Sequence, residues 1–215
     1  MNRESKPTLY GADYSVYVRI ARLTLAEKHI DYDLVPVDIF ADGGPPDWYG
    51  ALHPFSKIPA FEHDGLRLFE TTAIARYVDE AFDGPALQPS RPHERAVMNQ
   101  IVGLLDAYAY RTLVWDIYVE TVSKPREGKT ADDAVVSAAL LRAETCLATL
   151  TALKAPGPWL LGEQLTLADL HAAPMFGYFM QAEASVPMLA RHPALFDWWQ
   201  SMQARESFPG TSPTS

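Results

Sequence analysis

The sequence has little cysteine, little positive charge and no long apolar stretch, and each shortage excludes a class of protein. Cys146 is the single cysteine among 215 residues, which excludes an internal disulfide, a Cys-x-x-Cys redox pair and a multi-cysteine zinc site. Lys and Arg number 18 against 27 Asp and Glu, a net charge of −9 that argues against nucleic acid and anionic lipid as partners. No apolar run approaches the roughly 18 residues of a membrane span, so we expect a soluble, cytoplasmic protein.

The histidines also lack the spacing that a metal site requires. Six of them occur along the chain, without an HxxxH or HExxH pattern, so no bound metal is expected. What the chain does have is 48% hydrophobic residues, enough for one or two domains with a real core.

Strand and helix patterns alternate in the first third of the chain and then give way to helices alone. Short extended runs at 8–10, 31–38, 58–63 and 66–69 are interleaved with helical patterns at 15–28 and 71–82. Three prolines and a glycine at 83–92 indicate a connection between domains. We therefore predict an α/β domain at 1–83, a linker at 84–92 and an all-helical domain at 93–215, with 209–215 frayed.

The helical part contains four predicted helices. They are expected near 94–119, 131–153, 167–181 and 193–205, and Cys146 falls inside the second as a small buried side chain. Thr166 and Asp169 form a Thr-x-x-Asp pattern at the head of the third, which predicts a capping box with a structural role.

The most informative stretch is Leu52-His53-Pro54-Phe55-Ser56-Lys57-Ile58-Pro59-Ala60-Phe61, followed by Glu70-Thr71-Thr72-Ala73-Ile74. Together with Tyr10-Gly11, Ser15 and Thr166-Leu167-Ala168-Asp169, it resembles the cytosolic glutathione S-transferases of the serine type, theta-like, phi-like or bacterial. The resemblance covers nearly the whole chain. It implies a thioredoxin-like N-terminal domain that binds glutathione and a helical domain that contributes the electrophile site.

Both ends of glutathione find complementary groups in these motifs. Thr71 stands where a helix N-cap belongs, and its hydroxyl with the first helical N–H groups suits a carboxylate, while Glu70 suits an ammonium. Lys57 suits the glycyl carboxylate. In a thioredoxin-like fold the Ile58–Pro59 bond is expected to be cis, turning the backbone of Ile58 outward to pair with an extended peptide. The purely structural alternatives are that Thr71 is an ordinary helix cap, that Lys57 is a solvated surface lysine and that Pro59 merely starts a strand.

Ser15 is the catalytic candidate. It lies four residues after Gly11 at the start of a predicted helix, where the resemblance implies a donor to the glutathione thiolate; the alternative is a simple N-cap. Tyr10 is the second choice, because other branches of the family use a tyrosine near the end of the first strand. No cysteine occurs in the first domain, which weighs against thiol-disulfide chemistry.

The resemblance also implies where the electrophile binds, between the loop that holds Ala12 and Tyr14 and the long helix after the linker. On that helix Tyr110, Leu113 and Ile117 are spaced to share one face, although aromatic core and dimer packing are the alternative for this region. Asp106, one turn earlier, is a candidate to approach the glutathione amine, including across a dimer interface. His53 stands where many relatives have Asn.

These expectations combine into one function with named alternatives. We expect a homodimeric glutathione transferase that conjugates glutathione, its co-substrate, to a small hydrophobic electrophile, with no covalently bound cofactor. The alternatives are dehalogenation or peroxide reduction on the same scaffold, or a non-catalytic glutathione-binding or regulatory protein. The joint presence of Ser15, Lys57, Pro59, Glu70 and Thr71 favours an enzyme.

Overall fold

The computed structural model describes residues 6–213. It divides into two compact units, which are treated separately below. Within the described residues, the first unit comprises 6–86 together with 206–213, and the second comprises 87–205. The boundary near residue 86 lies inside the predicted linker, but the last residues join the first unit rather than the helical domain in which we placed them.

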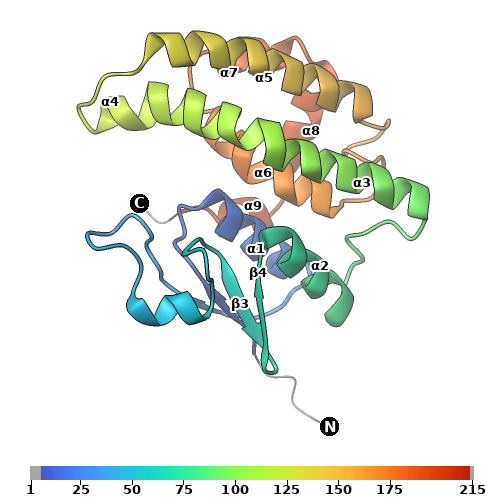
Figure 1. The fold of residues 1–215 in the computed structure, drawn as a ribbon. Helices are drawn as coiled ribbons and strands as arrows, with labels where there is room; N and C mark the ends of the chain where they lie inside the picture. The colour runs from blue at the N-terminus through green and yellow to red at the C-terminus, as the bar shows by residue number, and fades with distance from the viewer. Residues whose placement is uncertain (1–5, 214–215) are drawn as a thin grey trace. The chain divides into compact units, whose positions relative to one another are not determined.

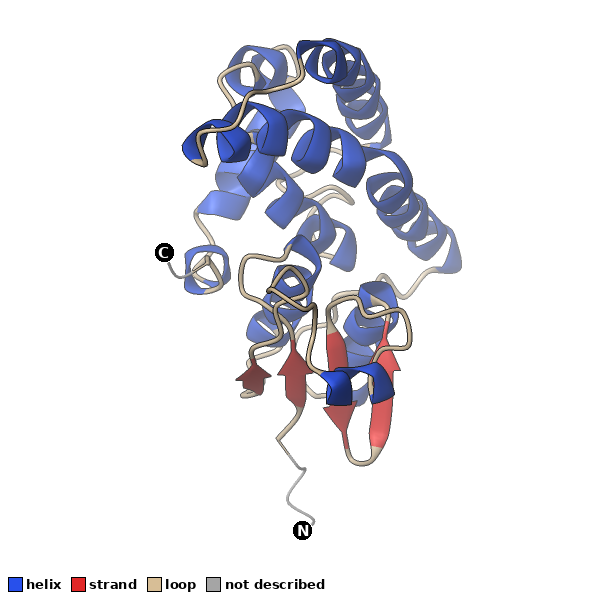
Figure 2. Ribbon diagram, turned by 60° about the vertical axis from the view of Figure 1, so that its left-hand side comes forward, coloured by secondary structure: helices blue, strands red, loops and turns tan. Residues whose placement is uncertain are grey.

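A four-stranded mixed sheet organises the first unit (Figures 1 and 2). Its strands are β1 (Thr8–Tyr10), β2 (Asp33–Val35), β3 (Ala60–His63) and β4 (Leu66–Phe69), in the order β2-β1-β3-β4. β2 runs parallel to β1, whereas β3 is antiparallel to both β1 and β4. All four strands were predicted. β2 and β3 are shorter than their sequence patterns, because a proline has no N–H for the ladder: β2 ends before Pro36 and β3 begins after Pro59.

Helices α1 (Val16–Glu27) and α2 (Thr71–Ala81) cover one face of this sheet, and the short 3₁₀ helix η1 (Asp47–Ala51) lies against the other (Figure 2). Apolar residues recur at helical spacing in α1 and α2, so each helix presents one stripe to the sheet. The core that results is continuous. Its fully buried members include Leu9, Val18, Ala21, Leu25, Tyr49, Phe61, Ile74 and Val78.

The chain's last described residues fold back onto α1. The guanidinium of Arg19 lies over the ring of Phe208, 4.1 Å from its centroid, and donates to the Phe208 carbonyl oxygen at 2.7 Å. Arg22 donates to the carbonyl oxygen of Thr211 at 3.1 Å. Residues 207–210 form the short helix α9 (Ser207–Gly210). The expectation of a frayed end at 209–215 is therefore wrong for 209–213, because two arginines of α1 hold this segment by hydrogen bonds that composition does not reveal.

The second unit is all-helical, as predicted, and built around one long helix (Figure 1). α3 (Pro92–Leu104) continues without a break through η2 (Leu105–Ser123), which is π-helical, into α4 (Lys124–Arg126). α5 (Asp133–Leu153) and α6 (Leu167–Phe179) pack against it, and α8 (Pro193–Gln203) packs against α5 and α6. α7 (Ser185–Ala190), which the sequence did not predict, precedes α8. Six residues interrupted by Pro187 are too few to give a periodic signal.

The predicted capping box is present at the start of α6. The Asp169 carboxylate accepts hydrogen bonds from the backbone N–H and hydroxyl of Thr166, at 2.8 and 2.9 Å, and from the Leu160 N–H at 2.7 Å. Trp198 of α8 adds a fourth donor, its indole Nε1, at 2.9 Å. Burial raises the pKa of Asp169, and these four donors oppose that rise. One carboxylate thus joins α6, α8 and the loop before α6.

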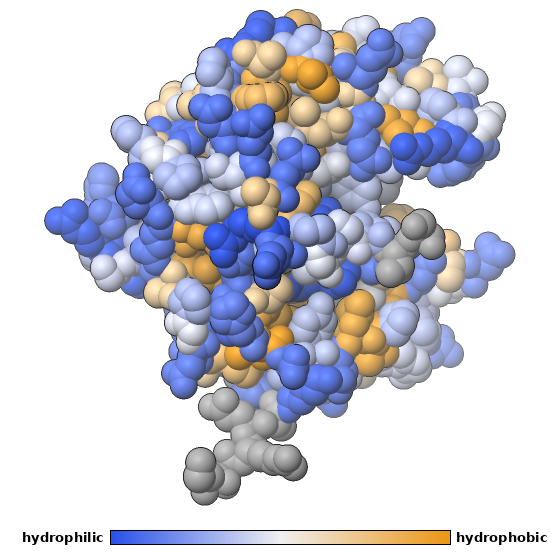
Figure 3. Space-filling view, turned by 180° about the vertical axis from the view of Figure 1, so that it is seen from behind, coloured by the Kyte–Doolittle hydropathy of each residue, from blue (hydrophilic) through white to orange (hydrophobic). Residues whose placement is uncertain are grey.

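Among the described residues, α5 is the one helix long and apolar enough, by length and composition, to cross a membrane. Two charged residues lie mid-helix and are tied to the rest of the unit: Arg142 pairs with Asp116 at 2.9 Å and Glu144 with His192 at 3.1 Å. α5 also packs against η2 and α8. On the face in Figure 3, apolar residues form separate patches among hydrophilic ones.

A buried ion pair between α1 and α2 gives a test of this packing. Lys28 Nζ lies 3.5 Å from an oxygen of the Asp79 carboxylate, and both side chains are almost fully buried. We expect Lys28→Met to lower the free energy of unfolding by about 3–5 kcal/mol, because it removes the cation of a buried ion pair. Chemical denaturation measures this loss. Lys6→Met, which breaks an exposed pair with Asp33, is the matched control and should change stability little; equal losses in the two variants would contradict the assignment.

Candidate active site in the first unit

The register of the sheet decides which segments meet at its functional edge. Ala60, the first residue of β3, lies opposite both Tyr10, the last residue of β1, and Phe69, the last residue of β4. Val35, the last residue of β2, also pairs with Tyr10. The segments after β1, β2 and β4 and the segment before β3 therefore all leave the sheet at one edge. The candidate residues at 12–15, 57–59 and 70–71 are brought together there.

Ser15 caps α1 at this edge. Its side-chain oxygen accepts the backbone N–H of Val18 at 3.4 Å, a long bond, and the residue is partly exposed. The first helical turn, Val16-Tyr17-Val18, carries no acidic side chain, so no carboxylate competes there for the positive end of the helix. Ser15 is thus the N-cap that the purely structural interpretation predicts, with its hydroxyl at the N-terminus of α1.

Gly11 sets how closely this loop approaches the start of β3. Its φ is +154°, and a Cβ added there would lie 2.3 Å from Cγ2 of Val18 and 3.3 Å from Cβ of Ile58. No side chain fits in that space. The loop that leads to Ser15 therefore packs directly against the Ile58–Pro59 segment.

Tyr10, the second catalytic candidate, has its hydroxyl engaged elsewhere. It donates to a carboxylate oxygen of Glu62 at 2.5 Å, and its ring packs edge-on against Trp48. Burial, followed by the hydrogen bond to Glu62, raises the pKa of Tyr10 to about 12. A phenol that already donates its proton to a carboxylate is poorly placed to donate it to sulfur.

The loop before β3 carries Lys57, Ile58 and Pro59. The Ile58–Pro59 peptide bond is cis, as expected for a thioredoxin-like fold, and Lys57 is exposed. The hydroxyl of Tyr49, a fully buried side chain of η1, donates to the Lys57 carbonyl oxygen at 2.7 Å. The sequence gives no sign of this contact, because a lone tyrosine in a Gly/Pro-rich segment forms no recognisable pattern.

Glu70 and Thr71 form the turn from β4 into α2. Glu70 is the N-cap, with φ +71° and ψ +109°, and Thr71 is the first helical residue. The prediction that Thr71 caps the helix is therefore wrong by one position, because the left-handed backbone of Glu70 keeps that residue out of the helix. Glu70 is exposed and Thr71 is buried. The first backbone N–H groups of α2 have no acceptor within the helix.

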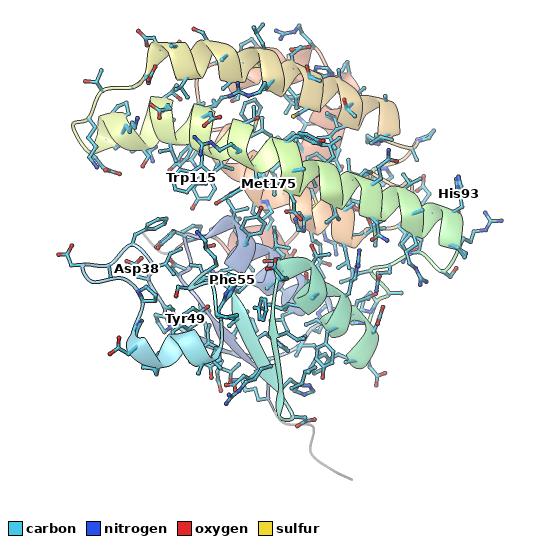
Figure 4. The ribbon with its side chains drawn as sticks, in the orientation of Figure 1. Asp38, Tyr49, Phe55, His93, Trp115 and Met175 are labelled. Carbon is cyan, nitrogen blue, oxygen red and sulfur yellow. The ribbon has the colours of Figure 1, made fainter. Side chains whose placement is uncertain are left out.

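Ala12 and Tyr14, the residues predicted to contact the electrophile, precede Ser15. Ala12 is partly exposed and Tyr14 is exposed. The Tyr14 hydroxyl donates to Asp38 at 2.5 Å, and its ring stacks on Phe40. Asp38 also accepts the Phe40 N–H at 2.8 Å, and the hydrogen bond from Tyr14 holds the pKa of Asp38 below its usual value. The contacts of Tyr14 therefore join the segment after β1 to the segment after β2, where Asp38 lies (labelled in Figure 4).

The remaining candidates lie in the second unit, on η2. Leu113 and Ile117 are fully buried, and Tyr110 is partly buried. Burial raises the pKa of Tyr110, which shares a hydrogen bond with Trp115 (labelled in Figure 4). Asp106, the candidate for the glutathione amine, pairs through Oδ1 with His171 Nε2 of α6 at 2.7 Å. Asp106 therefore already has a partner within this unit. The two residues are 65 positions apart, so their spacing in the sequence could not predict the pair.

Comparisons with known proteins agree on one family. Residues 9–86 match the family described as Glutathione S-transferase, N-terminal domain, and residues 110–206 match Glutathione S-transferase, C-terminal domain. Glutathione S-transferase F13 of Arabidopsis thaliana is 28% identical over 208 residues, covering 95% of this chain and 94% of that one. The chain belongs to the glutathione S-transferase family. Length, domain order and fold all fit this membership.

Solved structures of glutathione S-transferases have the same fold. Glutathione S-transferase III in its apo form superposes with a TM-score of 0.84 at 28% identity, over 96% of this chain and 95% of that one. A theta class glutathione S-transferase from the citrus canker pathogen Xanthomonas axonopodis pv. citri, with glutathione bound, gives 0.84 at 25% identity, over 97% and 98%. The predicted fold class, a thioredoxin-like domain followed by a helical domain, is confirmed.

Within the described residues, no group of three or more His, Cys, Asp and Glu side chains is arranged to hold a metal ion. Cys146 is buried in α5, and burial raises the pKa of its thiol, which makes it a poor nucleophile.

Proposed function

We propose that the protein is a serine-type glutathione transferase that stabilises the thiolate of glutathione and conjugates it to a hydrophobic electrophile. The observation that carries the proposal is the sheet register, which gathers Ser15, Lys57, Ile58, Glu70 and Thr71 at one edge. Family membership supplies the co-substrate, and the residues at this edge supply the roles proposed below.

Glutathione would lie across this edge with its two charged ends held apart. The exposed Glu70 carboxylate takes the γ-glutamyl ammonium, while the hydroxyl of Thr71 and the first N–H groups of α2 take the carboxylate on the same carbon. Lys57 takes the glycyl carboxylate. The backbone of Ile58, before the cis proline, pairs with the peptide in the manner of an added strand.

The thiolate would form at the start of α1. A free thiol has a pKa of about 8.5, and lowering it by about 2 units requires roughly 2.7 kcal/mol of preference for the anion. A charge-assisted hydrogen bond from the Ser15 hydroxyl contributes about 1.5–3 kcal/mol, and a helix N-terminus adds about 0.3–1 kcal/mol. One hydroxyl and one helix end are enough, and no general base is required.

The electrophile would meet the sulfur beside Ala12 and Tyr14, whose neighbour Phe40 extends the exposed apolar surface. Tyr110, Leu113 and Ile117 remain the proposed contribution of η2; Tyr110 is the strongest of the three, because the two aliphatic side chains are fully buried. Dehalogenation and peroxide reduction would begin from the same thiolate. A panel of aryl halides, enals and hydroperoxides separates these reactions.

Glutathione binding is tested by removing one charge. We expect Glu70→Gln to raise the dissociation constant for glutathione at least tenfold, because a charge-assisted hydrogen bond contributes about 1.5–3 kcal/mol. Titration calorimetry measures the constant. Glu80→Gln, an exposed carboxylate near the other end of α2, is the control and should bind as the wild type does. Absence of heat for the wild type at millimolar glutathione would refute the proposed function.

The role of Ser15 is tested by titrating the bound thiol. Ser15→Ala should raise the pKa of bound glutathione by roughly 1–2 units, whereas Ser15→Thr, which keeps a hydroxyl, should restore most of the shift. Tyr10→Phe should leave the pKa unchanged, since that hydroxyl donates to Glu62. The measurement is thiolate absorbance of the binary complex against pH. A shift in Tyr10→Phe but not in Ser15→Ala would transfer the role to Tyr10.

The proposed homodimer is tested through exposed aromatic residues. Phe55 of the first unit and Tyr108 of η2 leave 69% and 65% of their surfaces exposed, which is unusual for such large apolar side chains. Light scattering should give twice the 23.9 kDa chain mass for the wild type. Phe55→Ser and Tyr108→Ser should each weaken the dimer, and Val186→Ser, an exposed apolar residue of α7, should not. A monomeric wild type at micromolar concentration would contradict the dimer.

A further inference from the structure

His53 occupies the turn that leads into the glutathione-binding loop, and its side chain is nearly inaccessible, with 3% of the residue exposed. Its backbone N–H donates to the Tyr49 carbonyl oxygen at 3.0 Å, and its own carbonyl oxygen accepts the Ser56 N–H at 2.9 Å. Tyr49 and Phe55, labelled in Figure 4, lie on either side of His53 in the sequence. The residue is therefore fixed at both ends of a tight turn.

The imidazole ring joins two segments that carry proposed glutathione contacts. Its Nδ1 accepts the backbone N–H of Phe55 at 3.4 Å, within the turn that ends before Lys57. Its ring lies 4.9 Å from the ring of Phe69, the residue before Glu70. One side chain thus contacts both the loop before β3 and the end of β4.

Only an unprotonated Nδ1 can accept a hydrogen bond, because both ring nitrogens of a charged imidazole are donors. An asparagine in such a turn offers a side-chain oxygen that accepts the N–H two residues later. His53 therefore reproduces the acceptor of an asparagine with a group that titrates near neutral pH.

We propose that His53 is a positioning residue that makes glutathione binding pH-dependent: its neutral ring holds the turn before Lys57 against the end of β4, and protonation of Nδ1 releases that turn. The proposal rests on the proposed function, because it concerns the same site.

The charges around the ring set the direction of the effect. Burial lowers the pKa of His53; Glu70, from the turn after β4, favours the protonated ring, and Lys57, from the same loop as His53, disfavours it. Tyr49 of η1 faces the ring and stays neutral, since burial raises its pKa. Because the folded-state pKa is lowered, the neutral ring and its hydrogen bond persist at pH 7 and are lost as the pH falls below the usual histidine range.

The experiment is titration calorimetry with S-methylglutathione, whose blocked sulfur does not ionise, between pH 7.0 and 5.0, a range below the pKa of its amine and above those of its carboxylates. We expect the wild-type dissociation constant to rise about three- to tenfold, the factor that corresponds to losing one hydrogen bond. His53→Asn should bind like the wild type at pH 7.0 and change less than about twofold at pH 5.0. His29→Asn, an exposed histidine with a φ of +58° that asparagine tolerates, should keep the wild-type pH profile.

A second measurement needs no variant. Wild-type titrations with S-methylglutathione near pH 5.5, in buffers with different ionisation enthalpies, should reveal proton release on binding. A flat wild-type profile without proton release, or a His53→Asn profile that falls as the wild type does, would overturn the proposal. Failure of the wild type to bind at pH 7.0 would overturn the proposed function, and this proposal with it.

Discussion

The pairing of Ala60 with both Tyr10 and Phe69 is the constraint on which the candidate site depends. Because β3 is antiparallel to both neighbours, its beginning lies beside their ends. A shift of the register by one residue would turn the side chains of β3 to the opposite face and move Pro59 away from Gly11. The apolar face of Phe61 against the core fixes the register, so the packing that stabilises the sheet also assembles the site.

Hydrogen bonding then distinguishes among the polar groups near this edge. The hydroxyl of Tyr10 donates to Glu62 and that of Tyr14 donates to Asp38, each over 2.5 Å. Ser15 accepts a single long bond from its own helix, which leaves its proton available to an anion. The proposal for Ser15 therefore rests on which of these hydroxyl groups already donate to a carboxylate.

Most of the first unit could be predicted because each of its strands has an alternating or turn-bounded pattern and its motifs lie close together in the sequence. The Asp64-Gly65 pair, for example, is typical of a tight turn between two antiparallel strands, here β3 and β4. Both residues have positive φ, as such a turn requires. The start of α2 was misplaced by one residue, since nothing in the sequence reports the left-handed backbone of Glu70. Tyr49 contacts Lys57, and His53 contacts Phe55 and Phe69. These contacts depend on how the loop folds, and they leave no periodic pattern in the sequence.

The docking of residues 206–213 onto α1 has a consequence for the order in which the protein is made. Arg19 is synthesised early, but the carbonyl of Phe208 and the hydroxyl of Ser212 that accept its hydrogen bonds are synthesised almost two hundred residues later. During translation the sheet and its helices can form, yet the guanidinium of Arg19 stays without these partners until the whole second unit has left the ribosome. The domain that begins first is therefore completed last, and a nascent chain stopped within α8 would present this basic face of α1 to solvent or to a chaperone.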